Sequence, residues 1–171
     1  MNKLILYIAT SLDGYIAAPD GGVDWLDSST DVGYHDFLKT IDAIIMGRTT
    51  YDQVLTFGPW PYGDIPCYVF TNRNISNPPA GVVQVHGPAG PAYQEICRHG
   101  YGNIWLEGGA KIASAFRELH LIDEYRIYLQ PVWLGDGIPL FTAPLAPEEV
   151  KLHSTRTFPN GMVELVYTPL P

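Results

Sequence analysis

Two adjacent glycines near the middle of the chain could bring the backbone close to a phosphate group. They belong to Glu107-Gly108-Gly109-Ala110, which interrupts the apolar run 104–106 and precedes residues 111–121, where apolar side chains recur with helical spacing. Glycines at a strand-to-helix turn allow close approach of a ligand, and the first turn of a helix offers free N–H groups to an anion. The stretch favours a phosphate-bearing cofactor, although Gly108-Gly109 alone could be only a tight turn.

Three more polar motifs follow apolar runs in the same way. Ser11-Leu12-Asp13 follows the run 4–10, and the other two motifs are Gly47-Arg48-Thr49 and Thr71-Asn72-Arg73. In a parallel α/β sheet, ligands bind outside the carboxyl ends of the strands. We therefore expect these motifs to converge with Gly108-Gly109 on one binding site.

The residues between these motifs predict alternating strands and helices, as in an α/β domain with a mainly parallel sheet. Pro159-Asn160-Gly161 predicts a closing antiparallel hairpin. One apolar stripe of the last helix is expected to face the sheet, at Ile112, Ala115, Phe116 and Leu119. We expect strands over 4–10, 43–46, 67–71, 82–85, 104–106, 124–131, 149–157 and 162–168, and helices from Thr30 or Asp31 to Thr40 and over 49–55, 91–98 and 111–121.

The composition indicates one α/β domain over residues 1–171 and excludes several classes of partner. The 171 residues are 46% hydrophobic and carry a net charge of -8. An acidic chain lacks the basic patches that nucleic acids and anionic membranes require, and no apolar run reaches the roughly 18 residues of a membrane span. The N-terminus does not resemble a signal peptide. Cys67 and Cys97 fit a reducing cytoplasm, and the five histidines lack metal-ligand spacing.

Five segments carry a resemblance to a known family. They are TSLDGYIA (10–17), DAIIMGRTTYD (42–52), VFTNR (69–73), WLEGGAKI (105–112) and LIDEYRIYLQPVWLGDGIPLF (121–141). With these segments in this order, the chain resembles the dihydrofolate reductase superfamily, and more narrowly the branch related to the reductase domain of bacterial bifunctional riboflavin-biosynthesis deaminase/reductases. The resemblance implies a three-layer α/β/α dihydrofolate-reductase-like fold, in which a mixed, mainly parallel central sheet ends in an antiparallel hairpin. It also implies reduction by a nicotinamide cofactor.

The resemblance assigns cofactor-binding residues as well. Arg48 and Arg73 are two of only ten basic residues, and a guanidinium suits the 2′-phosphate that distinguishes NADPH from NADH. NADPH is therefore the expected cofactor. The residues carried over are Ala9 beside the nicotinamide, Gly47, Arg48 and Thr49 at a phosphate, Thr71, Asn72 and Arg73 at the adenosine end, Gly108, Gly109 and Ala110 under the pyrophosphate, and Lys111 and Ile112 at the start of the following helix.

The sequence indicates the acid that would supply a proton less clearly than it indicates the cofactor-binding residues. Folate reductases of this superfamily carry a carboxylate on the helix before the Gly-Arg strand, which the resemblance places at Asp31 or Asp36, and Trp25 upstream favours Asp31. Asp13 is typical of the riboflavin branch. Asp31 and Asp13 are therefore the candidate catalytic residues, and both are candidate substrate contacts together with Trp25. Asp13 could equally hydrogen-bond its own turn, and Asp31 could be only a helix N-cap.

The expected function is an NADPH-dependent reductase that transfers a hydride to a small heterocyclic substrate. It would resemble the 5-amino-6-(5-phosphoribosylamino)uracil reductase of riboflavin biosynthesis, yet no Lys or Arg occurs between Lys3 and Lys39 to hold a substrate phosphate. The alternatives are a dihydrofolate reductase and a module that binds NADP(H) without turnover. We also expect a homodimer, because relatives in the riboflavin branch commonly pair and the predicted edge strands are apolar.

Overall fold

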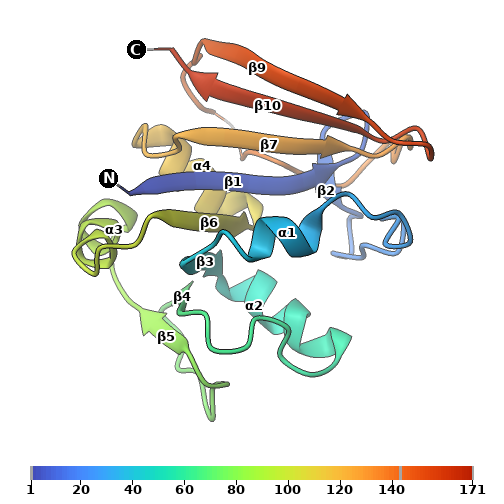
Figure 1. Cartoon of the computed structure of the whole chain (residues 1–171). Coiled ribbons are helices and arrows are strands. Elements are labelled where there is room, and N and C mark those ends of the chain that lie inside the picture. The colour runs from blue at the N-terminus through green and yellow to red at the C-terminus, as the bar shows by residue number, and fades with distance from the viewer. Residues whose placement is uncertain (1, 143, 171) are drawn as a thin grey trace.

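An eight-stranded sheet forms the centre of the computed structural model, which describes residues 2–142 and 144–170. Its order is β5-β4-β3-β6-β1-β7-β10-β9 (Figure 1). The strands are β1 (Lys3–Thr10), β3 (Ala43–Gly47), β4 (Cys67–Phe70), β5 (Val82–Val85), β6 (Asn103–Gly108), β7 (Glu124–Leu129), β9 (Val150–Thr157) and β10 (Val163–Pro169). The helices are α1 (Tyr34–Leu38), α2 (Arg48–Val54), α3 (Ala89–Cys97) and α4 (Ala110–Glu118), and a 3₁₀ turn covers Leu55–Phe57.

The sheet is mixed and mainly parallel, as the sequence predicts. All neighbouring strands from β5 to β7 run parallel, whereas β10 lies antiparallel to both β7 and β9. The carboxyl ends of β3, β4 and β6 therefore lie on one edge of the sheet, next to the helices that follow two of them. This edge is where a parallel sheet offers a ligand site.

Two separate cores give the fold three layers. Alternate residues of a strand point to opposite faces, so Ile5 and Tyr7 of β1 pack with Phe37 of α1 and Tyr51 of α2, all buried in one cluster. On the other face, buried Leu4 and Leu6 pack with residues of α3 and α4, including the fully buried Phe116. The three-layer α/β/α arrangement is thus confirmed.

The first helix begins later than predicted. Gly33, with φ 84, precedes α1 and makes no side-chain cap, and its N–H donates to Oδ1 of Asp31 at 2.8 Å. Neither Thr30 nor Asp31 caps the helix, because the left-handed conformation that glycine tolerates turns the chain just before Tyr34. Asp31 instead closes a turn ahead of the helix.

The predicted apolar stripe of α4 is confirmed at Ile112 and Phe116, which lie in or against one core cluster, and is wrong at Leu119. The helix starts at Ala110 and ends at Glu118, so Leu119 lies beyond it and is 48% exposed. Ala113 and Phe116 are fully buried against the sheet, while Ile112 approaches Gly47 and helps to line a cavity. The helix ends one residue before Leu119, so the last position of the predicted stripe lies outside it.

Other helix boundaries shift by one or two residues. Helix α2 starts at Arg48 rather than Thr49, and α3 starts at Ala89, so Pro91 is its third residue. Proline is tolerated there because the first N–H groups of a helix have no intrahelical acceptor. No helix within residues 2–142 and 144–170 has the length and apolar character needed to cross a membrane.

A two-stranded antiparallel sheet was not predicted. Strand β2 (Tyr15–Ala17) pairs with β8 (Ile138–Pro139). A Cβ atom at Gly137 would lie 2.4 Å from the carbonyl oxygen of Ala17, so only glycine allows this approach. The pairing joins segments more than 100 residues apart, which local sequence patterns do not reveal.

Candidate active site

A cavity of about 860 Å³ lies at the carboxyl ends of β3, β4 and β6. Most of the predicted cofactor residues line it, which brings three distant motifs together. Ala9 and Gly108 are not among the lining residues. The lining comprises Ile16, Ala17, Asp20, Gly21, Gly47, Arg48, Thr49, Thr50, Gln53, Phe70, Thr71, Asn72, Arg73, Gly109, Ala110, Lys111, Ile112, Ile138 and Thr142.

The glycine turn between β6 and α4 brings backbone to the cavity wall. The Gly108–Gly109 peptide is cis, and Gly108 has φ 113. A Cβ atom at Gly108 would lie 3.3 Å from Cδ1 of Ile8, and one at Gly109 would lie 3.4 Å from Oγ1 of Thr50. The small size of these residues keeps the backbone open beside the first turn of α4, whose free N–H groups suit a pyrophosphate.

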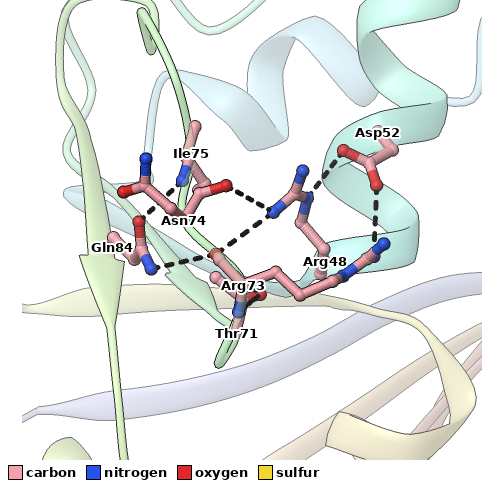
Figure 2. A network of polar contacts seen from close by, with 7 residues as sticks. All are labelled: Arg48, Asp52, Thr71, Arg73, Asn74, Ile75 and Gln84. Carbon is pink, nitrogen blue, oxygen red and sulfur yellow. Dashed lines mark hydrogen bonds and ion pairs between the residues drawn. The ribbon is translucent and has the colours of Figure 1, made fainter.

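Arg48 and Arg73 both line this cavity, and Asp52 connects them (Figure 2). Nε of Arg48 donates to Oδ1 of Asp52 at 2.7 Å, and its Nη1 lies 3.2 Å from the carbonyl oxygens of Arg73 and Asn74. Nη2 of Arg73 lies 3.5 Å from Oδ2 of Asp52. Two cations beside one carboxylate leave a positive end to the cavity, which suits a phosphate.

The loop that carries Arg73 is held by side chains on both sides. The N–H of Arg73 donates to Oγ1 of Thr71 at 3.0 Å. Gln84 of β5 accepts the N–H of Ile75 at 2.9 Å and donates to the carbonyl of Arg73 at 3.0 Å (Figure 2). These contacts fix the backbone of the loop while the Arg73 side chain stays 69% exposed. Neither Asp52 nor Gln84 was singled out from the sequence.

Glu107 is a partly buried acid directly before the glycine pair. Tyr62 donates a hydrogen bond to its Oε1, while its Oε2 is buried and finds no hydrogen-bond partner among the described residues. Burial raises the pKa of Glu107 to about 7, and the hydrogen bond from Tyr62 offsets only part of that rise. A carboxyl group with such a pKa carries a proton near neutral pH and can donate it.

Aromatic rings pack around Tyr62, the hydrogen-bond partner of Glu107. Tyr62 packs edge-on against Trp105 at 5.7 Å and against Trp60 at 5.0 Å between ring centroids. Tyr34 packs against Trp105 at 6.0 Å, and burial, with the nearby Glu107 carboxylate, raises the pKa of Tyr34 to about 12. An apolar wall of this kind is what keeps a carboxyl group protonated.

The predicted acids lie elsewhere and make other contacts. Asp13 accepts hydrogen bonds from Oγ of Ser11 at 2.6 Å and from the N–H groups of Leu134 and Gly135 at 3.2 and 2.8 Å. The Ser11 hydroxyl, followed by these N–H groups, lowers the pKa of Asp13, which does not favour proton donation. Asp31 is exposed, and Trp25 has a buried Nε1 without a hydrogen-bond partner in the described chain.

One signal in the sequence could have pointed to Glu107. Residues 104–106 form a buried strand, and the side chain two positions after Trp105 shares its face. The sequence predicts a turn that begins at Glu107, but β6 continues through Gly108. Glu107 thus lies at the carboxyl end of a central strand, on the face covered by α1 and α2.

Comparison with known proteins decides the family. The family model for the RibD C-terminal domain matches residues 2–164. The chain belongs to the RibD C-terminal domain family. This places it among RibD-like reductase domains with a dihydrofolate-reductase-like fold.

Individual relatives of this RibD-like chain agree. It is 41% identical over 169 residues to the uncharacterized protein YwjB of Bacillus subtilis (strain 168), with 96% of this chain and 97% of YwjB covered. The crystal structure of a putative riboflavin biosynthesis protein from Shewanella sp. PV-4 has a TM-score of 0.87 and 30% identity, covering 99% of each chain. Dihydrofolate reductase from Enterococcus faecalis, complexed with NADP(H), shares the fold with a TM-score of 0.70 at 18% identity, covering 98% and 96%.

Proposed function

We propose that the protein is an NADPH-dependent reductase that transfers a hydride to a small heterocyclic substrate, with Glu107 as the proton donor. The observation that carries this proposal is a carboxyl group at the end of β6, with one oxygen buried and unpaired among the described residues, one residue before the glycine turn of a cavity with two arginines. A module that only stores a dinucleotide has no use for such an acid, because burying an ionisable group is unfavourable.

The cavity residues suit a dinucleotide. The glycine turn and the start of α4 offer N–H groups to a pyrophosphate, and the Arg48 and Arg73 guanidinium groups suit a 2′-phosphate. When bound, the cofactor supplies the hydride, and the protein contributes binding, orientation and a proton. The side chains of Thr49, Thr50 and Lys111 line the same cavity and add further polar contacts.

Glu107 lies one residue before the glycine turn, although neither it nor Tyr62 is among the residues that line the cavity. Tyr62 holds one carboxyl oxygen, and the second oxygen, which has no hydrogen-bond partner in the described chain, is the one that would give up the proton. The surrounding rings exclude water and keep Glu107 protonated until transfer. The proposed substrate is a small planar heterocycle, by analogy with the riboflavin-branch reductases that the sequence resembles.

Steady-state NADPH oxidation tests the proposal. Purified protein would be assayed with 5-amino-6-ribosylaminouracil, with and without its 5′-phosphate, with dihydrofolate and with small quinonoid and carbonyl compounds. We expect oxidation with at least one heterocycle and loss of that activity in Glu107→Gln. Tight NADPH binding without oxidation across the panel would support the alternative, a non-catalytic NADP(H)-binding module, and turnover restricted to dihydrofolate would support a dihydrofolate reductase.

A further inference from the structure

Asp52 is the carboxylate that touches both cavity arginines, and it holds them very differently (Figure 2). Its bond to Nε of Arg48 is 2.7 Å long and joins residues i and i+4 of α2. Its contact with Nη2 of Arg73 spans 3.5 Å, at the limit of a hydrogen bond. Asp52 therefore holds Arg48 firmly and Arg73 only weakly.

Arg48 has little freedom to turn toward a ligand. Besides Asp52, its guanidinium reaches the carbonyl oxygens of Arg73 and Asn74, and its side chain is 22% exposed. Rotation would break all three contacts. The guanidinium of Arg48 thus joins α2 to the loop that follows β4, and Nη2 is the end left over for a ligand.

Arg73, unlike Arg48, has the freedom to turn toward a ligand. Its side chain is 69% exposed, and the contact with Asp52 is the one ion pair that it makes among the described residues. Exposed ion pairs of this kind add little to stability, so a phosphate group could readily replace Asp52 as the partner of Arg73. Most of the five N–H donors of a guanidinium remain available for that exchange.

We infer that Asp52 limits the preference of the cavity for a 2′-phosphate, by competing for Arg73 and by repelling the phosphate dianion. This inference rests on the proposed dinucleotide site. Two guanidinium groups and one carboxylate sum to a single positive charge, whereas a 2′-phosphate brings nearly two negative charges. A cofactor with a free 2′-hydroxyl feels little of this repulsion, so Asp52 narrows the difference in affinity between NADPH and NADH.

The test compares Asp52→Asn with the unchanged protein by fluorescence titration of NADPH and NADH, which needs no turnover. The amide oxygen of Asn can still accept the Nε–H of Arg48, so the change removes the charge and keeps that contact. We expect the NADPH dissociation constant to fall about 3- to 10-fold while that for NADH stays within about 2-fold. The gain should shrink at about 0.5 M salt, where charges are screened.

Matched controls isolate the local effect. Glu95→Gln makes the same charge change in an exposed i, i+3 pair with Arg98 on α3, which contributes no residue to the cavity lining, and should leave both dissociation constants unchanged. In an Arg73→Ala background, Asp52→Asn should lose most of its effect. Asp52→Ser, also uncharged and able to accept a hydrogen bond, replaces Asp52→Asn if that variant does not fold.

Two results would overturn the inference. Weaker NADPH binding in Asp52→Asn would show that the carboxylate positions the arginines instead of competing for them. An equal gain for NADH and NADPH would remove the link to the 2′-phosphate. Failure of the unchanged protein to bind either cofactor would reject the dinucleotide site itself, whereas binding without oxidation of NADPH would refute only the reductase proposal and leave this inference standing.

Discussion

At the scale of single residues, Glu107 combines the properties that acid catalysis requires. Its carboxyl group is buried beside aromatic rings, one oxygen is held by Tyr62, and the other lacks a partner in the described chain. Desolvation favours the neutral form of a carboxyl group, which explains the raised pKa. An acid with a pKa near the working pH is the most effective proton donor.

Glu107→Gln should therefore reduce kcat about 10²- to 10⁴-fold while leaving the NADPH dissociation constant nearly unchanged. Gln keeps the shape of the side chain and an acceptor for Tyr62, but it has no proton to donate. The measurement is kcat with the best heterocyclic substrate, alongside an NADPH titration. Asp31→Asn serves as the comparison. A larger loss of kcat in Asp31→Asn than in Glu107→Gln would indicate that Asp31, the acid expected from sequence, is the proton donor.

Tyr62→Phe should shift the pH dependence of kcat. Activity requires protonated Glu107, so it should be retained below a pH of about 7 and decline above it. The hydrogen bond from Tyr62 lowers the pKa of Glu107, and its removal should raise the pKa further and extend activity to higher pH. A pH profile measured for both proteins checks this, and a shift to lower pH would contradict it.

The same acid should make folding stability depend on pH. Its pKa rises from 4.5 in the unfolded chain to about 7 in the fold, so the folded state binds more protons between these values. The contribution of Glu107 to stability is then greatest below pH 4.5, falls as pH rises to about 7, and is constant above. Because 7 minus 4.5 is 2.5 pKa units, the total change is on the order of 3 kcal/mol.

Urea unfolding of the unchanged protein and of Glu107→Gln at several pH values would measure this linkage. Groups other than Glu107 contribute equally to both proteins, so the difference in free energy of unfolding isolates this carboxyl group. We expect the unchanged protein to become less stable relative to Glu107→Gln as pH rises from 4.5 to about 7. A difference that does not vary with pH would mean that Glu107 is solvated in the fold.

At the scale of elements, the loop after β4 depends on its neighbours for its shape. Short parallel strands end at this edge of the sheet, and the loop has few buried side chains apart from Ile75. Beyond the end of β4, the side chain of Gln84 on β5 makes hydrogen bonds to the loop in place of strand pairing. It accepts the N–H of Ile75 and donates to the carbonyl of Arg73. The side chain of Gln84 thus positions the backbone from which Arg73 projects.

Gln84→Ala should loosen this loop without disrupting the sheet. The lost hydrogen bonds should lower the free energy of unfolding by about 1 kcal/mol, speed amide exchange at Ile75 and weaken NADPH binding about 3- to 10-fold. Asn2→Ala, which removes a side-chain bond to the carbonyl of Cys97 far along the chain, should affect stability but not NADPH binding. Unchanged exchange at Ile75 in Gln84→Ala would contradict the assigned role.

At the scale of the whole molecule, the edge strand expected around Tyr125–Trp133 is interior, because β7 pairs with both β1 and β10, whereas β9 forms an exposed edge of the sheet. All eight residues of β9 are exposed, and Val150 and Leu152 remain 40% and 47% accessible. Trp133, at 71%, is exposed as well. A long edge strand with apolar side chains tends to pair with another chain unless it is covered.

We accordingly expect a homodimer in solution. Light scattering should give twice the chain mass of 18.9 kDa, and Leu152→Lys should shift the mass toward the monomer if β9 lies in the interface. Far-ultraviolet circular dichroism would verify that the variant keeps its fold. A mass of 18.9 kDa for the unchanged protein at micromolar concentration would refute the dimer.

The sequence by itself determined the strands of the main sheet and the motifs that line the cavity. Apolar runs of four to eight residues predict buried strands. Glycines and arginines that directly follow such runs are therefore expected at strand ends, where a parallel sheet binds ligands. These are local properties, which explains why Gly47, Arg48, Arg73 and Gly109 were found from sequence and do line one cavity. Their roles toward a cofactor stay predictions.

Only the tertiary structure decided how each carboxylate is paired and how far it is solvated. Tyr62 lies 45 residues from Glu107, Asp52 lies 21 residues from Arg73, and Asp13 binds N–H groups 121 and 122 residues away. Burial, solvation and pairing of a charge depend on such distant neighbours, and they determine whether an acid keeps its proton. Local pattern marks where a site forms, but packing determines that an oxygen of Glu107 is shielded from solvent and that Asp52 pairs with both arginines.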